Sequence, residues 1–262
     1  MSAIIIDDEV VHYEVLGRGR PLIFVHGWLG SWRYWIPTMQ ALSAEYRTYA
    51  VDLWGFGDTG KAGQRYHLDA QADLLYRFMD HLGILKAAFV GHGLGGAVVL
   101  RFAHQHPDWA DRSMAVSVPL QAAAVNARLA GGAPASLLEW LLGKGQEVEP
   151  ISREAAKADP QALEVGVRAV LDQDVRTELA SLERPCLLVY GEKDPMIAPP
   201  IDGALEGLNG SVHSVGLEES RHFPMLEEAA KFNRLLSDFL SLKSGESLTN
   251  LTLKEEWRRR VR

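Results

Sequence analysis

Short runs rich in β-branched and aromatic residues alternate with helical patterns along most of this 262-residue chain. Such alternation is typical of a mainly parallel sheet with helices on both faces. The first two runs, 3–6 and 10–15, are separated by two aspartates, which indicates a hairpin. The others are 21–25, 47–53, 86–90, 112–118, 186–190 and 211–215. The sequence therefore predicts an α/β fold with a mostly parallel central sheet flanked by helices.

Apolar residues recur at spacings of three and four in 68–82, 94–104 and 225–242, which predicts helices there. The segment 121–182 breaks the alternation, because it is rich in Ala and Leu and offers short helices but no strand. We interpret it as a helical lid that roofs a pocket; the alternative is a helical layer over the sheet. The expected organisation is a core over 1–120, the lid over 121–182, a second core part over 183–244 and a basic tail over 245–262.

The composition argues against several classes of protein. The net charge of -7 disfavours a nucleic-acid partner, and the single cysteine, Cys186, allows no intramolecular disulfide and is expected in the core. The N-terminus lacks the pattern of a signal peptide, and no apolar run is long enough for a membrane span. We expect a cytoplasmic protein. The tail ends "LKEEWRRRVR", a basic helix candidate that either folds back on its own domain or docks on a partner.

Four stretches place polar groups where predicted strands end. "FVHGWLGSWRYW" sets His26 and Gly27 at the end of a strand, from which a loop N–H can face an oxyanion. "VDLWGFGDTG" follows the next strand. "VYGEKDPMIAPP" ends a strand with Asp194 in a turn, and "ESRHFPMLEE" puts His222 in a loop just before a helix.

Together with "VGHGLGGAVV" (90–99), these motifs resemble the α/β-hydrolase family, especially its small lidded esterases, C–C bond hydrolases and haloperoxidase-like members. The resemblance covers the chain up to about residue 242. It implies that Asp194 is the acid, that His222 is the base and that the backbone N–H groups of Trp28 and Leu94 form the oxyanion hole. It places the nucleophile at Gly93, where this sequence departs from the G-x-S-x-G pattern.

A glycine at the elbow spares the fold and removes the nucleophile, because glycine adopts the strained turn freely but has no Oγ. No acyl-enzyme can form there. A His222–Asp194 pair is still able to activate water, an effect worth about 10² to 10⁴ in rate. The missing hydroxymethyl group is expected to leave room for a water or a substrate atom.

Other residues are assigned by their positions in these motifs. Substrate-binding residues are predicted at Gly27, His92, Trp32, Trp54 and Phe223. His26 and His92 are also expected to steady their loops. The aromatic residues that either line the pocket mouth or pack in the core are Trp28, Trp32, Tyr34, Trp35, Trp54 and Phe56.

Ser31 and Ser117 are the hydroxyls nearest to the strand ends. Neither is expected in a strained turn, so neither is favoured as a replacement nucleophile.

The run 91–96 also matches G-x-G-x-x-G, the dinucleotide fingerprint. A nucleotide role is disfavoured, because the next predicted strand ends in Ser117-Val118-Pro119 and supplies no acid for a ribose. Three hypotheses remain open. The first is a hydrolase-type enzyme acting on a small apolar ester or carbonyl substrate, either serine-independent or with its native nucleophile replaced. The others are a ligand-binding pseudo-hydrolase and a protein that acts through its tail. We expect no cofactor and no metal.

Overall fold

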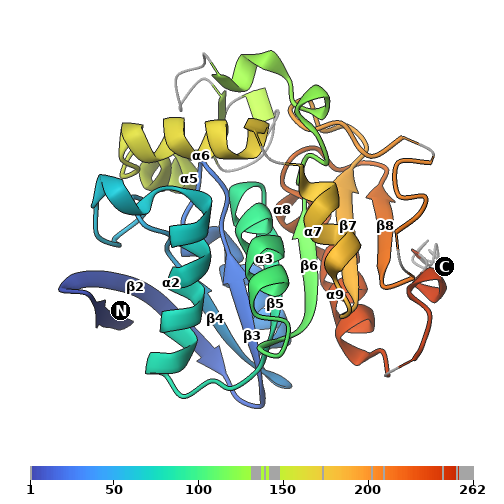
Figure 1. Ribbon diagram of the computed structural model, residues 1–262, viewed down its shortest axis with the longest axis horizontal. Helices are drawn as coiled ribbons and strands as arrows, with labels where there is room; N and C mark the ends of the chain where they lie inside the picture. The colour runs from blue at the N-terminus through green and yellow to red at the C-terminus, as the bar shows by residue number, and fades with distance from the viewer. Residues whose placement is uncertain are drawn as a thin grey trace, which may run out of the picture.

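The structure is a computed structural model that describes residues 2–130, 137–138, 140–141, 148–172, 174–201, 203–208, 210–243, 245–251 and 253. Its eight-stranded sheet has the order β1-β2-β4-β3-β5-β6-β7-β8 (Figure 1). The pairings β1–β2 and β2–β4 are antiparallel, and all those from β4 to β8 are parallel. The strands are β1 (Ser2–Ile6), β2 (Glu9–Gly17), β3 (Arg20–Val25), β4 (Tyr46–Val51), β5 (Ala87–His92), β6 (Ala110–Val116), β7 (Cys186–Gly191) and β8 (Val212–Leu217). The predicted α/β fold is confirmed.

The hairpin between β1 and β2 is also confirmed. Asp7 and Asp8 have φ values of 49° and 65°, which is the backbone that a two-residue hairpin turn of type I′ requires. Aspartate tolerates this region better than most residues do.

Helices cover both faces of the sheet. On one face α3 contacts both α2 and α7, and on the other α1 contacts α9 (Figure 1). The single helix predicted over 225–242 is wrong in one respect, because Glu228 has φ -125° and ψ 50° and divides it. The helices are α1 (Ile36–Leu42), α2 (Leu68–His81), α3 (Leu94–Gln105), α5 (Val148–Ala155), α6 (Pro160–Asp172), α7 (Val175–Ser181), α8 (Pro224–Glu227) and α9 (Ala229–Ser241).

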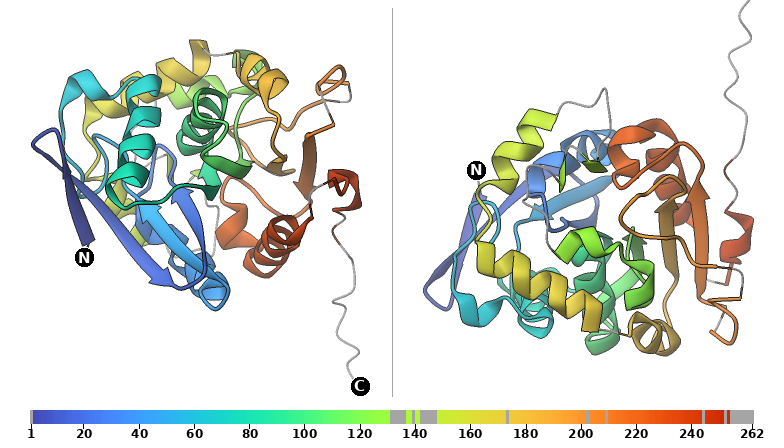
Figure 2. Two further views of the ribbon diagram at one scale, coloured as in Figure 1. Left: turned by 60° about the horizontal axis from the view of Figure 1, so that its bottom comes forward. Right: turned by 90° about the horizontal axis from the view of Figure 1, so that it is seen from above.

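The segment between β6 and β7 carries α5, α6 and α7. Seen from above, α5 and α6 spread over the carboxyl ends of the strands (Figure 2). In contrast, α7 contacts α3 on the face of the sheet, so this end of the segment belongs to the helical layer. Two short 3₁₀ turns, Ala122–Ala124 and Ala127–Ala130, lead into the segment.

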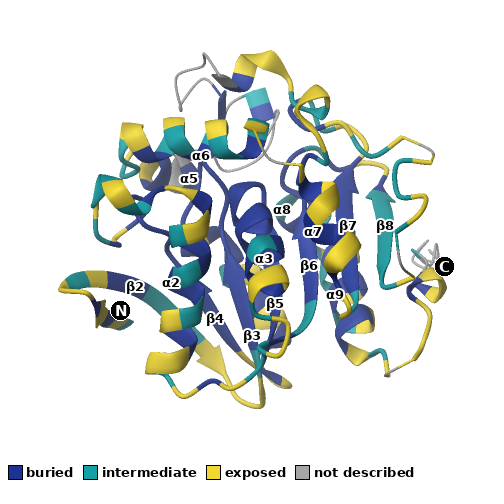
Figure 3. Ribbon diagram, in the orientation of Figure 1, coloured by how far each residue is buried: buried dark blue, intermediate teal, exposed yellow. Residues whose placement is uncertain are grey.

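The buried core is formed by the parallel strands and by the first turns of α3, which pack on them. Figure 3 shows β3, β5, β6 and β7 buried, whereas β8 at the edge is only partly covered. Cys186 is fully buried at the start of β7, and burial raises the pKa of its thiol to about 12. Gly95 permits close packing of α3, because a Cβ there would lie 2.5 Å from Val25 O. The glycine-rich run therefore has a packing role in this fold.

Two further predictions concern the C-terminal tail and a membrane-spanning helix. In the tail, Leu248–Asn250 forms a 3₁₀ turn. Apart from 245–251 and 253, the tail over 245–262 lies outside the described residues. Among the residues that are described, no helix is long and apolar enough to cross a membrane.

Candidate active site

The turn between β5 and α3 has the strand–turn–helix context of a nucleophile elbow, with Gly93 at its tip. Gly93 has φ 52° and ψ -117°, a backbone region that favours glycine. Its N–H donates to Val116 O at 2.9 Å, and its carbonyl accepts from Ala97 N–H at 3.1 Å as the helix begins. The backbone of an elbow is present, and the residue at its tip has no side chain.

The indole ring of Trp28 lies against the place where a side chain at position 93 would start. A Cβ built on Gly93 would be 3.3 Å from Cε3 and Cζ3 of this ring. At the pyrrole end of the same ring, a Cβ built on Gly166 in α6 would be 3.3 Å from Cδ1 and Nε1. Trp28 is only 2% exposed, so its ring packs between two glycine backbones. The room expected beside Gly93 is therefore closely bordered by this ring.

One predicted oxyanion donor, Trp28, lies on the loop after β3, and the other, Leu94, lies at the start of α3. Gly27 Cα would be 3.7 Å from a Cβ on Gly93, which brings the loop of Trp28 against the elbow. Leu94 is the first residue of α3, where backbone N–H groups lack partners within the helix. In the described part of the chain, neither Trp28 N–H nor Leu94 N–H has a hydrogen-bond partner outside a helix or strand. Both groups therefore remain candidates for binding an oxyanion.

Asp194 and His222 form a hydrogen-bonded pair beyond the carboxyl ends of β7 and β8. Nδ1 of His222 lies 2.8 Å from Oδ2 of Asp194, and both side chains are buried. Oδ1 of Asp194 accepts the backbone N–H groups of Met196 at 2.8 Å and Ile197 at 3.2 Å. Because an ionised carboxylate only accepts, His222 Nδ1 carries the shared proton and Nε2 is left with its lone pair. Among the described residues, the hydrogen bonds of His222 are made by Nδ1 and by the backbone oxygen, and none is made by Nε2.

A chain of hydrogen bonds joins the oxyanion loop, the elbow and the histidine loop. Gly27 N–H donates to Tyr34 Oη at 2.6 Å, and Tyr34 Oη lies 3.0 Å from His92 Nδ1. His92 Nε2 lies 2.8 Å from the backbone oxygen of His222. Burial lowers the pKa of His92 well below its usual value, and a proton taken up by the nearby His222 would lower it further. His92 therefore stays neutral and holds the loops together, as expected of a structural residue.

Two charged residues support the loop of His222. Glu227 Oε2 accepts the Arg221 N–H at 2.6 Å, and burial raises the pKa of this carboxyl to about 7. The Arg221 side chain donates to the carbonyls of Trp140 at 2.5 Å and Leu141 at 3.0 Å, within the inserted segment. The histidine loop is thereby tied to the insert.

The structure corrects one expectation about Ser117. This residue follows β6 with φ 50°, so it does occupy a strained turn. Its side chain is fully buried, and Oγ donates to the backbone oxygen of His222 at 3.4 Å. The hydroxyl is directed at a carbonyl rather than at the imidazole, which gives Ser117 a role in supporting the loop. Ser31 Oγ accepts the Arg33 N–H at 3.3 Å and caps a 3₁₀ turn.

The predicted substrate-binding residues fall into two groups. Phe223 meets the His222 ring edge-on, with centroids 5.2 Å apart, and Gly27 and His92 belong to the same cluster. Trp32 instead donates its N–H to Asp52, and Trp54 exchanges two backbone hydrogen bonds with the Gln71 side chain. Within the described residues, neither tryptophan has a ring contact with His222.

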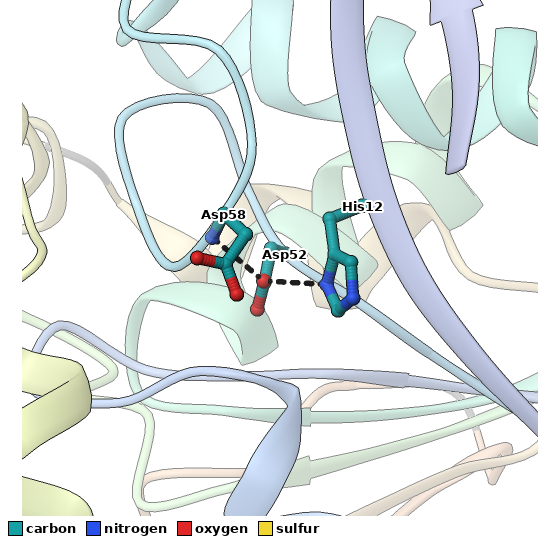
Figure 4. A group of neighbouring side chains, drawn as sticks. All are labelled: His12, Asp52 and Asp58. Atoms are coloured by element: carbon teal, nitrogen blue, oxygen red, sulfur yellow. Dashed lines mark hydrogen bonds and ion pairs between the residues drawn. The ribbon is translucent and has the colours of Figure 1, made fainter. Parts of the chain in front are cut away.

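Sequence reasoning missed a second histidine–aspartate pair, formed by His12 in β2 and Asp52 after β4 (Figure 4). His12 Nδ1 lies 2.9 Å from Asp52 Oδ2, which also accepts the Asp58 N–H at 3.1 Å. Asp52 Oδ1 accepts the Trp32 N–H at 2.9 Å. The three side chains are close enough to share a cation, but His12 and Asp52 are already bonded to each other and Lys157 pairs with Asp58. The sequence feature that could have revealed this pair is Asp52, an aspartate directly after the buried strand β4.

Comparisons with known proteins agree with this architecture. Residues 20–144 match the family model described as the alpha/beta hydrolase fold. The dihydrolipoyllysine-residue acetyltransferase component of the acetoin cleaving system from Pseudomonas putida is 33% identical over 87% of this chain, which spans 65% of that relative's length. The pimeloyl-[acyl-carrier protein] methyl ester esterase of Vibrio cholerae is 27% identical, with 87% of this chain and 97% of the esterase covered.

A solved structure gives the same result for the fold. It is a serine-to-glycine mutant of the N-acyl homoserine lactonase AidH, complexed with N-hexanoyl homoserine lactone. Its TM-score is 0.80 at 22% identity, with 91% of this chain and 96% of that chain covered. This chain has the α/β-hydrolase fold, and residues 20–144 are similar in sequence to the model of that family. The relative named as an esterase is a hydrolase, which supports the class of hydrolase for this chain.

Proposed function

We propose that the protein is a hydrolase-type enzyme that acts on a small, largely apolar ester or other carbonyl substrate without a serine nucleophile. The observation that carries the proposal is the place of the His222–Asp194 pair, on a loop that His92 joins to the turn of Gly93. Its 2.8 Å hydrogen bond and the two turn N–H groups on Asp194 hold the imidazole with Nε2 free to accept a proton. Holding the base in one tautomer and one orientation is the role of the acid in this kind of pair.

The reaction then follows from general-base catalysis. His222 Nε2 takes a proton from water while the water oxygen forms a bond to the substrate carbonyl carbon. The carbonyl π bond breaks, and the resulting oxyanion accepts the N–H groups of Trp28 and Leu94. The intermediate collapses by expelling the alkoxide, which takes the proton from protonated His222. Ester and water thus give acid and alcohol, and the base is regenerated.

A second candidate function is a pseudo-hydrolase that binds a small ligand under the insert. The packing of Trp28 against Gly93 favours it, because the ring lies only 3.3 Å from the place of a nucleophile's Cβ. The named relatives bear on both candidates. One is a methyl ester esterase, and the lactonase was solved in a serine-to-glycine form with an acyl lactone bound.

The test is turnover of a panel of small esters, lactones and diketones by the chain as it is and by His222→Ala. His81→Ala is the matched control, since His81 is exposed at the end of α2. The enzyme proposal expects turnover that His222→Ala lowers by about 10² to 10⁴ and His81→Ala leaves unchanged. Turnover that survives His222→Ala contradicts it. Saturable binding without turnover selects the second candidate.

A further inference from the structure

Helix α6 of the insert packs on both residues that carry the proposed oxyanion donors. Its buried residues are Ala162, Gly166 and Val170, which are spaced by four and therefore lie on one face of the helix. The helix contacts α3, which begins at Leu94, and seen from above it crosses the carboxyl ends of the strands (Figure 2). Gly166 is the middle residue of the buried face.

The backbone of Gly166 borders the side chains of both donor residues. A Cβ built on Gly166 would lie 2.9 Å from Leu94 Cδ2 and 3.3 Å from Cδ1 and Nε1 of Trp28. Trp28 follows β3 and Leu94 begins α3, so the two side chains come from separate elements. Both are buried. One position in the insert thus lies against both residues whose N–H groups are proposed to bind the oxyanion.

This close approach explains the glycine at position 166. Glycine inside a helix is less favourable than alanine, because it loses more backbone freedom on folding. Gly166 is not among the glycines with positive φ, so its backbone conformation does not require glycine. The space around it does, because even the Cβ of an alanine would press on Leu94 and crowd Trp28.

The Trp28 ring has little room to move away from α6. Its other end lies 3.3 Å from the position of a Cβ on Gly93, so a push from Gly166 would drive the ring toward the elbow. Protein interiors are close-packed, and a displaced side chain therefore shifts the backbone that carries it. An oxyanion hole needs its donors within about 2.7–3.1 Å of the oxyanion, so small shifts of these N–H groups weaken it.

We propose that Gly166 is a positioning residue for the oxyanion hole. Its bare backbone lets Trp28 and Leu94 pack against α6 in the arrangement in which their N–H groups face one oxyanion. Gly166 does not touch the reacting atoms and acts only through these two side chains. The inference rests on the proposed function, since it concerns the oxyanion that forms in that reaction.

The experiment measures the binding of matched probes by calorimetry. The probes are ethyl n-alkyl ketones of increasing chain length, each paired with the methyl n-alkylphosphonate monoanion of the same length, whose tetrahedral anionic group resembles the intermediate. The parent chain should bind the phosphonate of at least one length tighter than its ketone. Gly166→Ala should lower this preference about tenfold, less than the roughly 10² to 10³ lost when a donor is removed outright. Ketone binding should change little, because a ketone carries no full negative charge.

Gly210→Ala is the matched control, because Gly210 also lacks a positive φ and a Cβ there meets nothing within 4 Å. It should leave the preference intact. Adding Leu94→Val to Gly166→Ala removes Cδ2, the atom nearest to the new Cβ, and should restore part of the preference. The double variant also relieves the crowding if Gly166→Ala alone does not fold, which thermal unfolding shows.

Four results would overturn the positioning role. They are a parent chain without phosphonate preference, a preference unchanged in Gly166→Ala, an equal loss of ketone and phosphonate binding, and no recovery in the double variant. The equal loss is what a merely structural role predicts. Ester turnover that Gly166→Ala leaves unchanged removes the positioning role and leaves the proposed function standing. A Gly166-dependent phosphonate preference without ester turnover supports the positioning role and rejects the enzyme proposal.

Discussion

Two histidine–aspartate pairs of nearly equal geometry lie in this protein, and their surroundings differ. His222 Nδ1 is 2.8 Å from Asp194, and His12 Nδ1 is 2.9 Å from Asp52. Asp194 takes its two other bonds from its own turn, whereas Asp52 takes N–H groups from Trp32 and Asp58, on separate loops. A histidine–aspartate pair by itself is therefore not evidence of catalysis, and neither His222 nor His12 has a hydrogen bond at Nε2 among the described residues. The pairs differ in position: the loop of His222 is joined through His92 and Tyr34 to Gly27, whereas His12 Nε2 lies 3.6 Å from Glu14.

Asp194→Asn should distinguish the role of the His222–Asp194 pair from that of the His12–Asp52 pair most clearly. An Asn oxygen still accepts the turn N–H groups, but its NH₂ forces His222 Nδ1 to accept and moves the proton to Nε2. We expect turnover to fall by about 10² to 10⁴ with little change in the unfolding free energy. Steady-state kinetics and urea unfolding measure the two effects. A variant that is as active as the parent would remove Asp194 from the mechanism.

Asp52→Asn should instead lower the unfolding free energy and change turnover little. Either orientation of the amide sets its NH₂ against a backbone N–H that cannot turn into an acceptor, Trp32 N–H or Asp58 N–H. Breaking such a buried charged network costs about 3–5 kcal/mol of unfolding free energy. Urea unfolding at neutral pH measures it. Loss of turnover in Asp52→Asn without a loss of unfolding free energy would contradict a structural role for Asp52.

Gly93→Ser tests what the missing nucleophile means for the fold. We expect a loss of about 1–3 kcal/mol from backbone strain, plus a cost for moving the Trp28 ring. Gly83→Ser is the matched control, because Gly83 also has positive φ (66°) but a Cβ there meets nothing within 4 Å. Thermal unfolding should show Gly93→Ser to be the more destabilising of the two. Equal losses of unfolding free energy in the two variants would mean that the Trp28 ring moves aside without cost.

A smaller effect is expected at Glu227, beside the catalytic candidate. Burial raises its pKa from 4.5 to about 7, although the Arg221 N–H favours the charged form. The native state therefore holds this proton more tightly than the unfolded chain does. Its contribution to stability is full below about pH 4.5 and is lost as the pH rises to 7. Glu227→Gln should flatten the stability profile in this window.

Glu228→Gln is the control for Glu227, because the pKa of Glu228 is shifted the other way. Burial raises it, but contacts with Lys231 and Ser220 outweigh burial and lower it. The stability from Glu228 is present above pH 4.5 and is lost as the pH falls through the lowered pKa. If both variants change the profile in the same direction, the assignment to Glu227 is wrong.

The smallest effect should come from His12. Burial lowers its pKa, but the hydrogen bond and charge of Asp52 outweigh burial and raise it above 6.5. Its stabilisation is thus complete below pH 6.5 and is lost as the pH rises through the raised pKa. His12→Gln should flatten urea-unfolding profiles above pH 6.5, and a profile unchanged there would contradict the assignment.

The sequence was informative wherever one local pattern decides the structure. Alternating runs predicted all eight strands of the part of the chain that the structure describes, and the two aspartates predicted the first hairpin. The broken helix at Glu228 escaped prediction because the apolar spacing continues across the break. Contacts between distant segments escaped it as well, such as Tyr34 with His92 and His12 with Asp52. The left-handed backbone of Ser117 has no signal in its own side chain, since the surrounding loops impose it.

The hydrogen-bond chain from Gly27 to His222 also prevents proton transfer from the loop of Gly27 to the His222 ring. An amide N–H at one end only donates, and a backbone oxygen at the other end only accepts. Tyr34 must therefore donate to His92 Nδ1, and His92 must carry its proton on Nε2, so every proton points the same way. Because the chain ends on a carbonyl, no proton can be relayed along it to the His222 ring. A proton that this base gains must come from the substrate side.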